Sequence, residues 1–250
     1  LGRVDVACVD KTGTLTEGHI ALIAVSDGVT EMPIAALHLA PEARRILAAG
    51  LRASPGTARD DLVHAEDRAL VDGAGEADVS ASDGVDEWRR LAELPFEAGR
   101  AFHAVLGKGA RSATLLTVKG APEVVLARCS RWPADRANDS LTGAKRRRLM
   151  DHAHRMARRG LRVLAVAERP MPTATSLHEH RVGGLAFVGF IAYSDPVRPE
   201  ASDALRDVQR AGVGQLVRGH EDDVGIGRID GDGDDGGLRK SGPRRVPARA

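Results

Sequence analysis

The chain has 250 residues, enough for one large domain or two of ordinary size, and 42% of them are hydrophobic, which suffices for a sizeable core. Aromatic residues make up only 3%, so alanine, valine and leucine must fill that core. The formal net charge of +1 gives no reason to expect nucleic acid as a partner, and no segment approaches the ~20 apolar residues of a membrane helix.

The first predicted element is a short buried strand at 4–9, an apolar run rich in β-branched residues. It ends at Asp10, and the glycine and three threonines at 11–16 indicate a turn at its carboxyl end. A second extended piece is predicted at 18–24, before a turn at 27–28.

Two helices and then a sheet are predicted in the middle of the chain. Residues 41–50 are a helix candidate with proline in the first turn, and 65–71 are another, which the glycine-rich residues 72–75 should end. The period then changes, and three strands separated by turns indicate an antiparallel sheet. These strands are predicted at 88–96, 101–106 and 112–119.

Helices and strands alternate in the last third of the chain. Helices are predicted at 122–129, 141–159 and 201–211, and strands at 161–167 and 185–191. After Gly212 no hydrophobic period survives, and 222–237 consists largely of aspartate and glycine. We therefore predict that 214–250 is a disordered or aberrant tail.

Seven consecutive residues at 10–16, Asp-Lys-Thr-Gly-Thr-Leu-Thr, resemble the phosphorylation signature of P-type cation-transporting ATPases. They follow a predicted buried strand, and ligands bind at the strand ends of open parallel sheets. The resemblance implies that Asp10 is the nucleophile that accepts the γ-phosphate of ATP as an aspartyl-phosphate. It also implies that Lys11 supplies positive charge there, and that Asp10 and the main-chain carbonyl of Thr12 supply part of an Mg²⁺ shell.

Thr12 separates two related chemistries. Soluble phosphatases of the wider haloacid-dehalogenase-like superfamily typically carry a second aspartate at this position, which helps water to cleave the intermediate. Threonine offers no such acid, so the phosphoenzyme should persist, as a transport cycle requires. The alternative interpretation of the motif is a turn after a strand, without chemistry.

Two segments resemble nucleotide-binding elements of the same family. Lys119 and Gly120 open a Lys-Gly-Ala-Pro-Glu element, where the lysine can reach adenine or phosphate and the glycine leaves room for the base. A strand–turn–helix junction is the alternative. Phe96 and Arg100 lie in a Pro-Phe-x-x-x-Arg segment, where Phe96 would stack on adenine and Arg100 would meet phosphate. The alternative is that Phe96 fills the core.

Four further residues are assigned to the nucleotide by resemblance. Arg162 is a lone charge in an apolar strand, and its partner is either phosphate or an acidic side chain. Asp67 resembles an acidic position near the adenine. Asp195 and Arg198, in an Asp-Pro-Val-Arg element, resemble the hinge near the bound nucleotide. A proline-stiffened turn before a helix explains the same element and is compatible with that role.

The resemblance covers about 4–212, and some parts expected of the family are absent from the sequence. These are the actuator domain with its Thr-Gly-Glu loop, the membrane helices, the Thr-Gly-Asp loop and the later loop that supplies another magnesium carboxylate. A change of reading frame near 214–218 is our hypothesis for a truncated C-terminus.

The predicted fold class is α/β. It combines a partial haloacid-dehalogenase-like, Rossmann-type phosphorylation domain with an inserted α+β nucleotide-binding domain built on an antiparallel sheet. We assign 1–27 and 184–213 to the phosphorylation domain, 28–183 to the nucleotide-binding domain and 214–250 to the tail.

The function that we expect is that of a fragment of an ATP-driven cation pump, which binds ATP with Mg²⁺ and is autophosphorylated on Asp10 in the intact parent. Its partners would be ATP and the membrane and actuator portions of that parent, at the cytoplasmic face of the membrane. The chain alone is expected to be soluble and cytoplasmic, and not to turn over ATP, because half of the metal site is missing. A non-catalytic nucleotide-binding remnant and a soluble phosphatase of the same superfamily stay as alternatives.

Overall fold

The computed structural model describes residues 6–35, 40–56, 62–110, 114–132, 140–171 and 176–218. The chain divides into two compact units. The small unit consists of Leu1–His19 and Asp195–Ala250, and the large unit consists of Ile20–Ser194.

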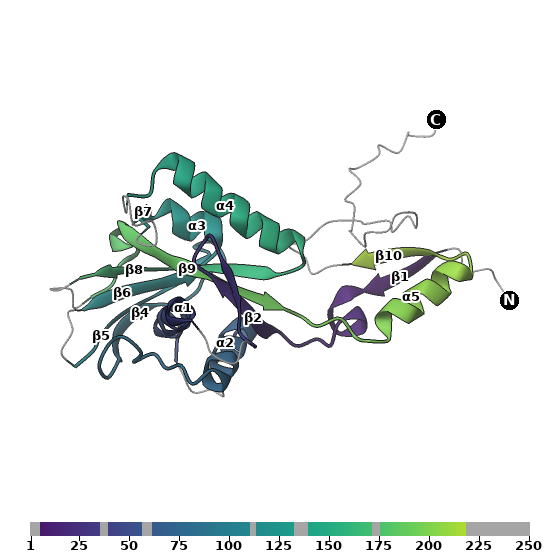
Figure 1. Cartoon of the computed structure of the whole chain (residues 1–250), viewed down its shortest axis with the longest axis horizontal. Helices are drawn as coiled ribbons and strands as arrows, with labels where there is room; N and C mark the ends of the chain where they lie inside the picture. Colours follow the sequence, from purple (N-terminus) through teal and green to yellow (C-terminus); the bar gives the residue numbers. More distant parts are fainter. Residues whose placement is uncertain are drawn as a thin grey trace. The chain divides into compact units, whose positions relative to one another are not determined.

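The large unit is built on a sheet of 8 strands (Figure 1). The order along the sheet is β3-β2-β9-β8-β6-β5-β4, and all neighbours in this order are antiparallel, which confirms the predicted antiparallel sheet. β7 stands outside this order and pairs with β9 in parallel. The strands are β2 (Ala21–Ser26), β3 (Glu31–Pro33), β4 (Arg89–Leu94), β5 (Phe102–Lys108), β6 (Leu115–Gly120), β7 (Cys129–Arg131), β8 (Arg162–Pro170) and β9 (Leu185–Ser194).

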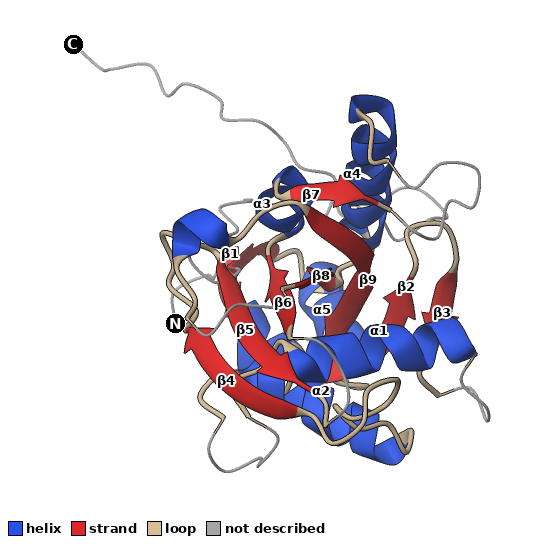
Figure 2. Cartoon of the chain, turned by 90° about the vertical axis from the view of Figure 1, so that its left-hand side faces the viewer, coloured by secondary structure: helices blue, strands red, loops and turns tan. Residues whose placement is uncertain are grey.

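Helices cover both faces of this sheet. α1 (Pro41–Arg52) and α2 (Ala65–Glu76) lie on one face, and α3 (Pro122–Ala127) and α4 (Gly143–Arg158) on the other; Figure 2 shows the sheet between the two pairs. Proline starts α1 and α3, where its missing N–H has no helical partner to lose. Within the described ranges, no helix is both long and apolar enough to cross a bilayer.

A separate hydrophobic cluster fills each side of the sheet. β8 contributes to both, because successive side chains of a strand point to opposite faces. Val163, Ala165 and Ala167 belong to the cluster that includes residues of α3 and α4. Val166 belongs to the cluster that includes residues of α1 and α2. The large unit therefore has a core on each face of its sheet.

α2 is longer than the sequence predicts, and its predicted end at 72–75 is wrong. The helix continues to Glu76 and buries Gly73. A Cβ atom at Gly73 would lie 2.6 Å from Leu22 Cδ2 of β2. Glycine thus permits a close approach between helix and strand, and this packing outweighs its weak helix propensity.

The small unit holds β1 (Val6–Asp10) and β10 (Gly214–Arg218), which pair in parallel. α5 (Ala201–Arg210) precedes β10, and one π-helical turn, Lys11–Leu15, follows β1. Residues 214–218, assigned by the sequence to the tail, thus form a strand instead of starting a disordered segment. The rest of the predicted tail lies outside the described residues.

β1 is less buried than a core strand would be. Val6 is 51% exposed and Cys8 is exposed. The reason is that the sheet of the small unit has 2 strands in the part of the chain that the structure describes. A doubly wound phosphorylation domain needs more strands and helices on both faces, so that part of the predicted fold stays a prediction.

The boundaries between the two units differ from the predicted domain boundaries. β2 and β9 pair with each other in the large sheet. Residues 20–27 and 184–194 therefore pack with the large unit, whereas the sequence assigns them to the phosphorylation domain. Which unit binds nucleotide and which is phosphorylated stays a prediction.

Candidate functional site

The first turn of α2 contacts three predicted nucleotide-binding residues that lie far apart in the sequence. His64 precedes the helix, and Glu66 and Asp67 lie in its first turn. Each of these side chains contacts a different residue of the predicted site. His64 contacts Phe96, Glu66 contacts Arg162, and Asp67 contacts Lys119.

Lys119 forms a buried ion pair with Asp67. Lys119 is 4% exposed and Asp67 is 5% exposed, so little water surrounds them. The ammonium group donates hydrogen bonds to the Asp67 carboxylate and, at 2.6 Å, to Ser54 Oγ. The carboxylate and the hydroxyl offset the desolvation of the lysine, which an apolar setting would not do. The predicted adenine-side acid and the predicted nucleotide-binding lysine are thus direct partners.

Phe96 and Arg162 stay partly open to solvent beside this pair. Phe96 is 42% exposed, so it does not fill the core, and its ring stands edge-on to His64 with centroids 5.4 Å apart. Arg162 Nε donates to Glu66 Oε1 at 2.7 Å, while 63% of the arginine side chain is exposed. The acidic partner that the sequence left open for Arg162 is therefore present, and its guanidinium group still faces water.

Arg100 has protein partners of its own. Its side chain is 8% exposed, donates to the Pro95 carbonyl at 2.7 Å and pairs with Glu97 at 2.8 Å. The guanidinium carbon also lies 5.7 Å from the ring centroid of Phe102. These contacts fasten the loop between β4 and β5, and none of them joins Arg100 to the first turn of α2.

Gly120 is explained by strand packing. A Cβ atom at this position would lie 2.4 Å from the carbonyl oxygen of Ala101 and 2.6 Å from Phe102 Cα. The backbone of β5 occupies the space beside the glycine, so β5 and β6 need glycine here whether or not a base binds nearby.

His103 was not predicted from the sequence, and it lies opposite Lys119 in the β5–β6 pair. It is 5% exposed, and its Nε2 atom has no hydrogen-bond partner among the described residues; Glu93 Oε2 is 3.8 Å away. Burial and then the charge of Lys119 lower the pKa of His103 from 6.5 to about 4. The ring is therefore neutral at pH 7. Its signal in the sequence is a single polar residue inside the apolar run at 102–106.

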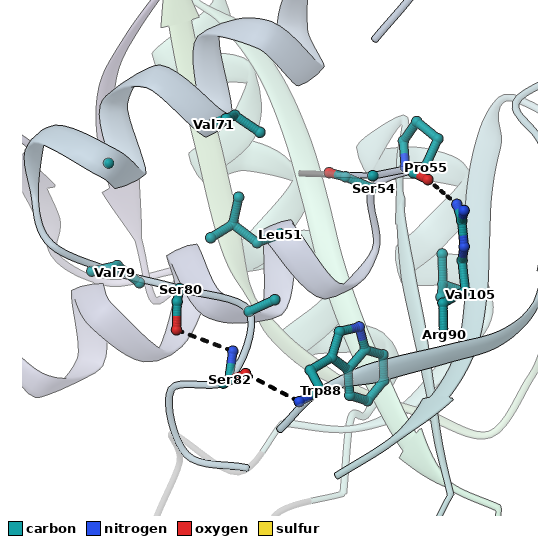
Figure 3. A pocket seen from close by; sticks show the side chains of 13 residues that line it. Leu51, Ser54, Pro55, Val71, Val79, Ser80, Ser82, Trp88, Arg90 and Val105 are labelled. Atoms are coloured by element: carbon teal, nitrogen blue, oxygen red, sulfur yellow. Dashed lines mark hydrogen bonds between the residues drawn. The ribbon is translucent and has the colours of Figure 1, made fainter. Parts of the chain in front are cut away.

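A cavity of about 490 Å³ lies near this region. Figure 3 shows residues of its wall. Ser54, the hydroxyl partner of Lys119, forms part of its wall, and so does Val105 of β5. Elsewhere in the wall, Ser82 already has a hydrogen-bond partner in the protein, because its Oγ accepts from Trp88 N at 3.0 Å. The cavity thus touches the ion pair through Ser54. The other lining residues are Leu51, Pro55, Gly56, Val71, Gly75, Val79, Ser80, Ala81 and Arg90.

In the small unit, Asp195 and Arg198 fasten the loop that follows the phosphorylation motif. Asp195 accepts hydrogen bonds from Thr16 Oγ1 at 2.6 Å and from Gly18 N at 3.0 Å. Arg198 donates to the carbonyl oxygens of Thr16 at 3.0 Å and Gly13 at 3.2 Å. The two residues thus join the segment before α5 to the segment after β1, and a contact of either with nucleotide stays a prediction.

Asp10 ends β1, and Lys11 and Thr12 begin the π-helical turn. The backbone therefore places the predicted nucleophile at a strand end, while the side chains of these three residues lie outside the described part. Gly13 has φ +80, a conformation that favours glycine. Across the described ranges, His, Cys, Asp and Glu side chains form no group of three or more that could hold a metal ion.

Comparison with known proteins gives the family. Residues 48–200 match the family described as "P-type ATPase, cytoplasmic domain N". "Probable cation-transporting ATPase I" of Mycobacterium tuberculosis is 32% identical in an alignment 233 positions long, which covers 84% of this chain and 13% of that protein. "Calcium-transporting ATPase 1" of Bacillus cereus is 27% identical, over 85% of this chain and 24% of that protein. "Magnesium-transporting ATPase, P-type 1" of Escherichia coli is also 27% identical, over 85% of this chain and 22% of that protein.

The match to domain N includes the ion pair, His103 and the strands that carry them. The chain spans only 13% to 24% of the length of these relatives. The family match extends over more than half of the chain, and the antiparallel sheet is consistent with it. The chain therefore belongs to the P-type ATPases.

Proposed function

We propose that the large unit binds ATP at the first turn of α2. The observation that carries this proposal is the convergence of Phe96, Arg162 and Lys119 on three neighbouring side chains at the start of α2. All three come from segments that resemble nucleotide-binding elements. A planar base is matched there by an aromatic ring, and a charged phosphate chain is matched by a guanidinium and an ammonium group.

The exposed and buried residues would have different tasks. Phe96 offers an open aromatic face to the adenine ring, and Arg162 offers a hydrated cation to the phosphates. Lys119 is already neutralised by Asp67, so it would hold the inner end of the nucleotide while keeping that partner. Arg100 and Gly120 would support the site through the shape of the β4–β5–β6 region.

In the intact parent, the γ-phosphate of ATP would pass to the Asp10 carboxylate, coupled to cation transport. The position of Asp10 at the end of β1, and Thr12 two residues later, support this proposal. The hydrogen bonds from Arg198 and to Asp195 would keep the following loop in place. The large unit would then lie at the cytoplasmic face of the membrane, with the membrane and actuator portions as partners.

The donor atoms that this loop offers are oxygens, which is the type of ligand that Mg²⁺ prefers. The ion keeps some of its waters, and it is commonly held by one or two carboxylates together with substrate phosphates. Asp10 and the main-chain carbonyl of Thr12 are such donors. When bound, the ion would neutralise phosphate charge, while Asp10 supplies the attacking oxygen.

Nucleotide titration of the purified chain tests the binding proposal. We expect Lys119→Ala to weaken ATP binding about tenfold or more, because a buried cation is lost and Asp67 is left unpaired. Lys108→Ala, at the far end of β5, is the matched control and should bind as the parent chain does. Equal affinities of the parent and Lys119→Ala chains would contradict the proposal.

Radiolabelled ATP tests the phosphorylation proposal in the intact parent. We expect an acid-stable, hydroxylamine-labile label that Asp10→Asn abolishes. Nucleotide binding without any label on the intact parent would instead favour the non-catalytic remnant.

A further inference from the structure

We propose that His103 reads the base of the bound nucleotide, its Nε2 atom accepting a hydrogen bond from the exocyclic amino group of adenine. This inference rests on the proposed function and adds a specificity-determining residue to that site. It predicts a preference for ATP over a nucleotide that carries a carbonyl oxygen in place of this amino group.

The position of His103 in the sheet supports this proposal. His103 and Lys119 are directly opposite each other in the β5–β6 pair, so their side chains leave the sheet on the same face. That face carries α1 and α2, because Lys119 bonds to Ser54 just after α1 and to Asp67 in α2. Val105, two residues further along β5, shares this face and lines the cavity. His103 therefore stands beside Lys119, on the sheet face that also carries the cavity.

The Nε2 atom of His103 also supports the proposal. Nε2 is buried and has no hydrogen-bond partner among the described residues, while the neighbouring Lys119 donates to two acceptors. Proteins rarely leave a buried polar atom unpaired, and such an atom calls for an explanation. A bound ligand that donates a hydrogen bond to Nε2 would be a direct explanation, because His103 stands beside Lys119, which the nucleotide would reach.

The charge state of the His103 ring fits the same role. A protonated imidazole would have no lone pair to accept with, but burial and the charge of Lys119 lower the pKa of His103 to about 4. The ring is therefore neutral at pH 7 and has one accepting nitrogen, which is Nε2 in the tautomer that carries its proton on Nδ1. A second cation would also repel the ammonium group of Lys119, whereas a neutral acceptor does not.

The test compares ATP with inosine triphosphate, which has a carbonyl oxygen where ATP has the amino group. Both are titrated into the purified full chain, the parent and three variants. His103→Leu removes both ring nitrogens, His103→Gln keeps an accepting oxygen, and His152→Leu changes another buried histidine, which bonds to Ser26.

We expect the parent chain to bind ATP about tenfold more tightly than inosine triphosphate, as one hydrogen bond to a buried group allows. His103→Leu should bind both at the weaker affinity, His103→Gln should keep part of the preference, and His152→Leu should keep all of it. Circular dichroism melts of each variant identify any that does not fold, and the preference of the parent chain is measured independently of them.

The outcomes distinguish this inference from the proposed function. If the parent binds neither nucleotide, the proposed function fails. If the parent binds ATP, Lys119→Ala weakens binding, and the parent accepts both nucleotides equally, the role of His103 is overturned while the binding site stands. An unchanged preference in His103→Leu has the same consequence for His103.

Discussion

At the scale of single residues, the ion pair between Lys119 and Asp67 determines how the site responds to mutation. Both side chains are almost fully buried, and Ser54 supplies a second hydrogen bond to the ammonium group. Burying two charges costs free energy that their attraction only partly returns, whereas removing one partner leaves the other unpaired in an apolar setting. The pair is therefore a weak source of stability but a sensitive point of failure.

We predict that Asp67→Ala lowers the free energy of unfolding by about 3–5 kcal/mol, because it strands the ammonium group of Lys119. The double variant Asp67→Leu/Lys119→Met should lose less than Asp67→Ala alone, since it leaves no charge behind. Urea unfolding of the variants measures both. A double variant that is less stable than Asp67→Ala would contradict this explanation.

A second residue-scale prediction concerns pH and His103. Its pKa falls from 6.5 to about 4 on folding, so between these values the unfolded chain binds a proton that the folded chain does not. Stability should therefore fall as the pH falls through this window, by about 2 kcal/mol for this group between pH 7 and pH 5. His152, whose pKa is also lowered by burial, contributes in the same direction. The charged groups around His103 are Lys119, Asp67, Glu93 and Arg90.

Urea midpoints at pH 7 and pH 5 check this prediction. His103→Leu should lose less stability on acidification than the parent chain, because leucine cannot take up the proton. An identical loss of stability in both chains would mean that other groups cause the destabilisation at low pH.

At the scale of elements, the sequence predicts an element best where one local pattern decides it. The proline starts of α1 and α3 and the strand pattern around β5 and β6 are such cases. The end of α2 was missed because Gly73 is set by its contact with Leu22, a residue far away in the sequence. The candidate site shows the same limit. The sequence motifs indicate Lys119, whereas His103 becomes a candidate only because the strand pairing places it opposite Lys119.

α2 also carries an element-scale prediction with a control in the same helix. Gly73→Ala would place a Cβ atom 2.6 Å from Leu22, so the helix must shift away from β2. We expect a loss of about 1–3 kcal/mol and weaker ATP binding, because the first turn of this helix holds the proposed site. Gly75→Ala has no atom within 4 Å of its Cβ and should be neutral or slightly stabilising.

Thermal melts and nucleotide titration of the two glycine variants make this comparison. If Gly73→Ala is as stable as Gly75→Ala and binds ATP equally well, the close approach of α2 to β2 is not what positions the site.

At the scale of the whole molecule, the two units differ in how completely they enclose a core. The large unit has hydrophobic clusters on both faces of an 8-stranded sheet, each covered by two helices. The described part of the small unit has a 2-stranded sheet, with Val6 51% exposed. A structure with its own closed core can fold alone, whereas a two-stranded sheet with open faces is marginal.

We therefore predict that the segment 20–194, expressed alone, unfolds cooperatively and binds ATP within about twofold of the full chain, since one closed core makes it an independent folding unit. Asp195→Ala in the full chain is the complementary variant: it removes the hydrogen bonds to Thr16 and Gly18 within the small unit. It should leave the main melting transition, which belongs to the large unit, unchanged. Calorimetry and titration measure both quantities, and a segment 20–194 that neither melts cooperatively nor binds ATP would mean that the large unit depends on the small one for its fold.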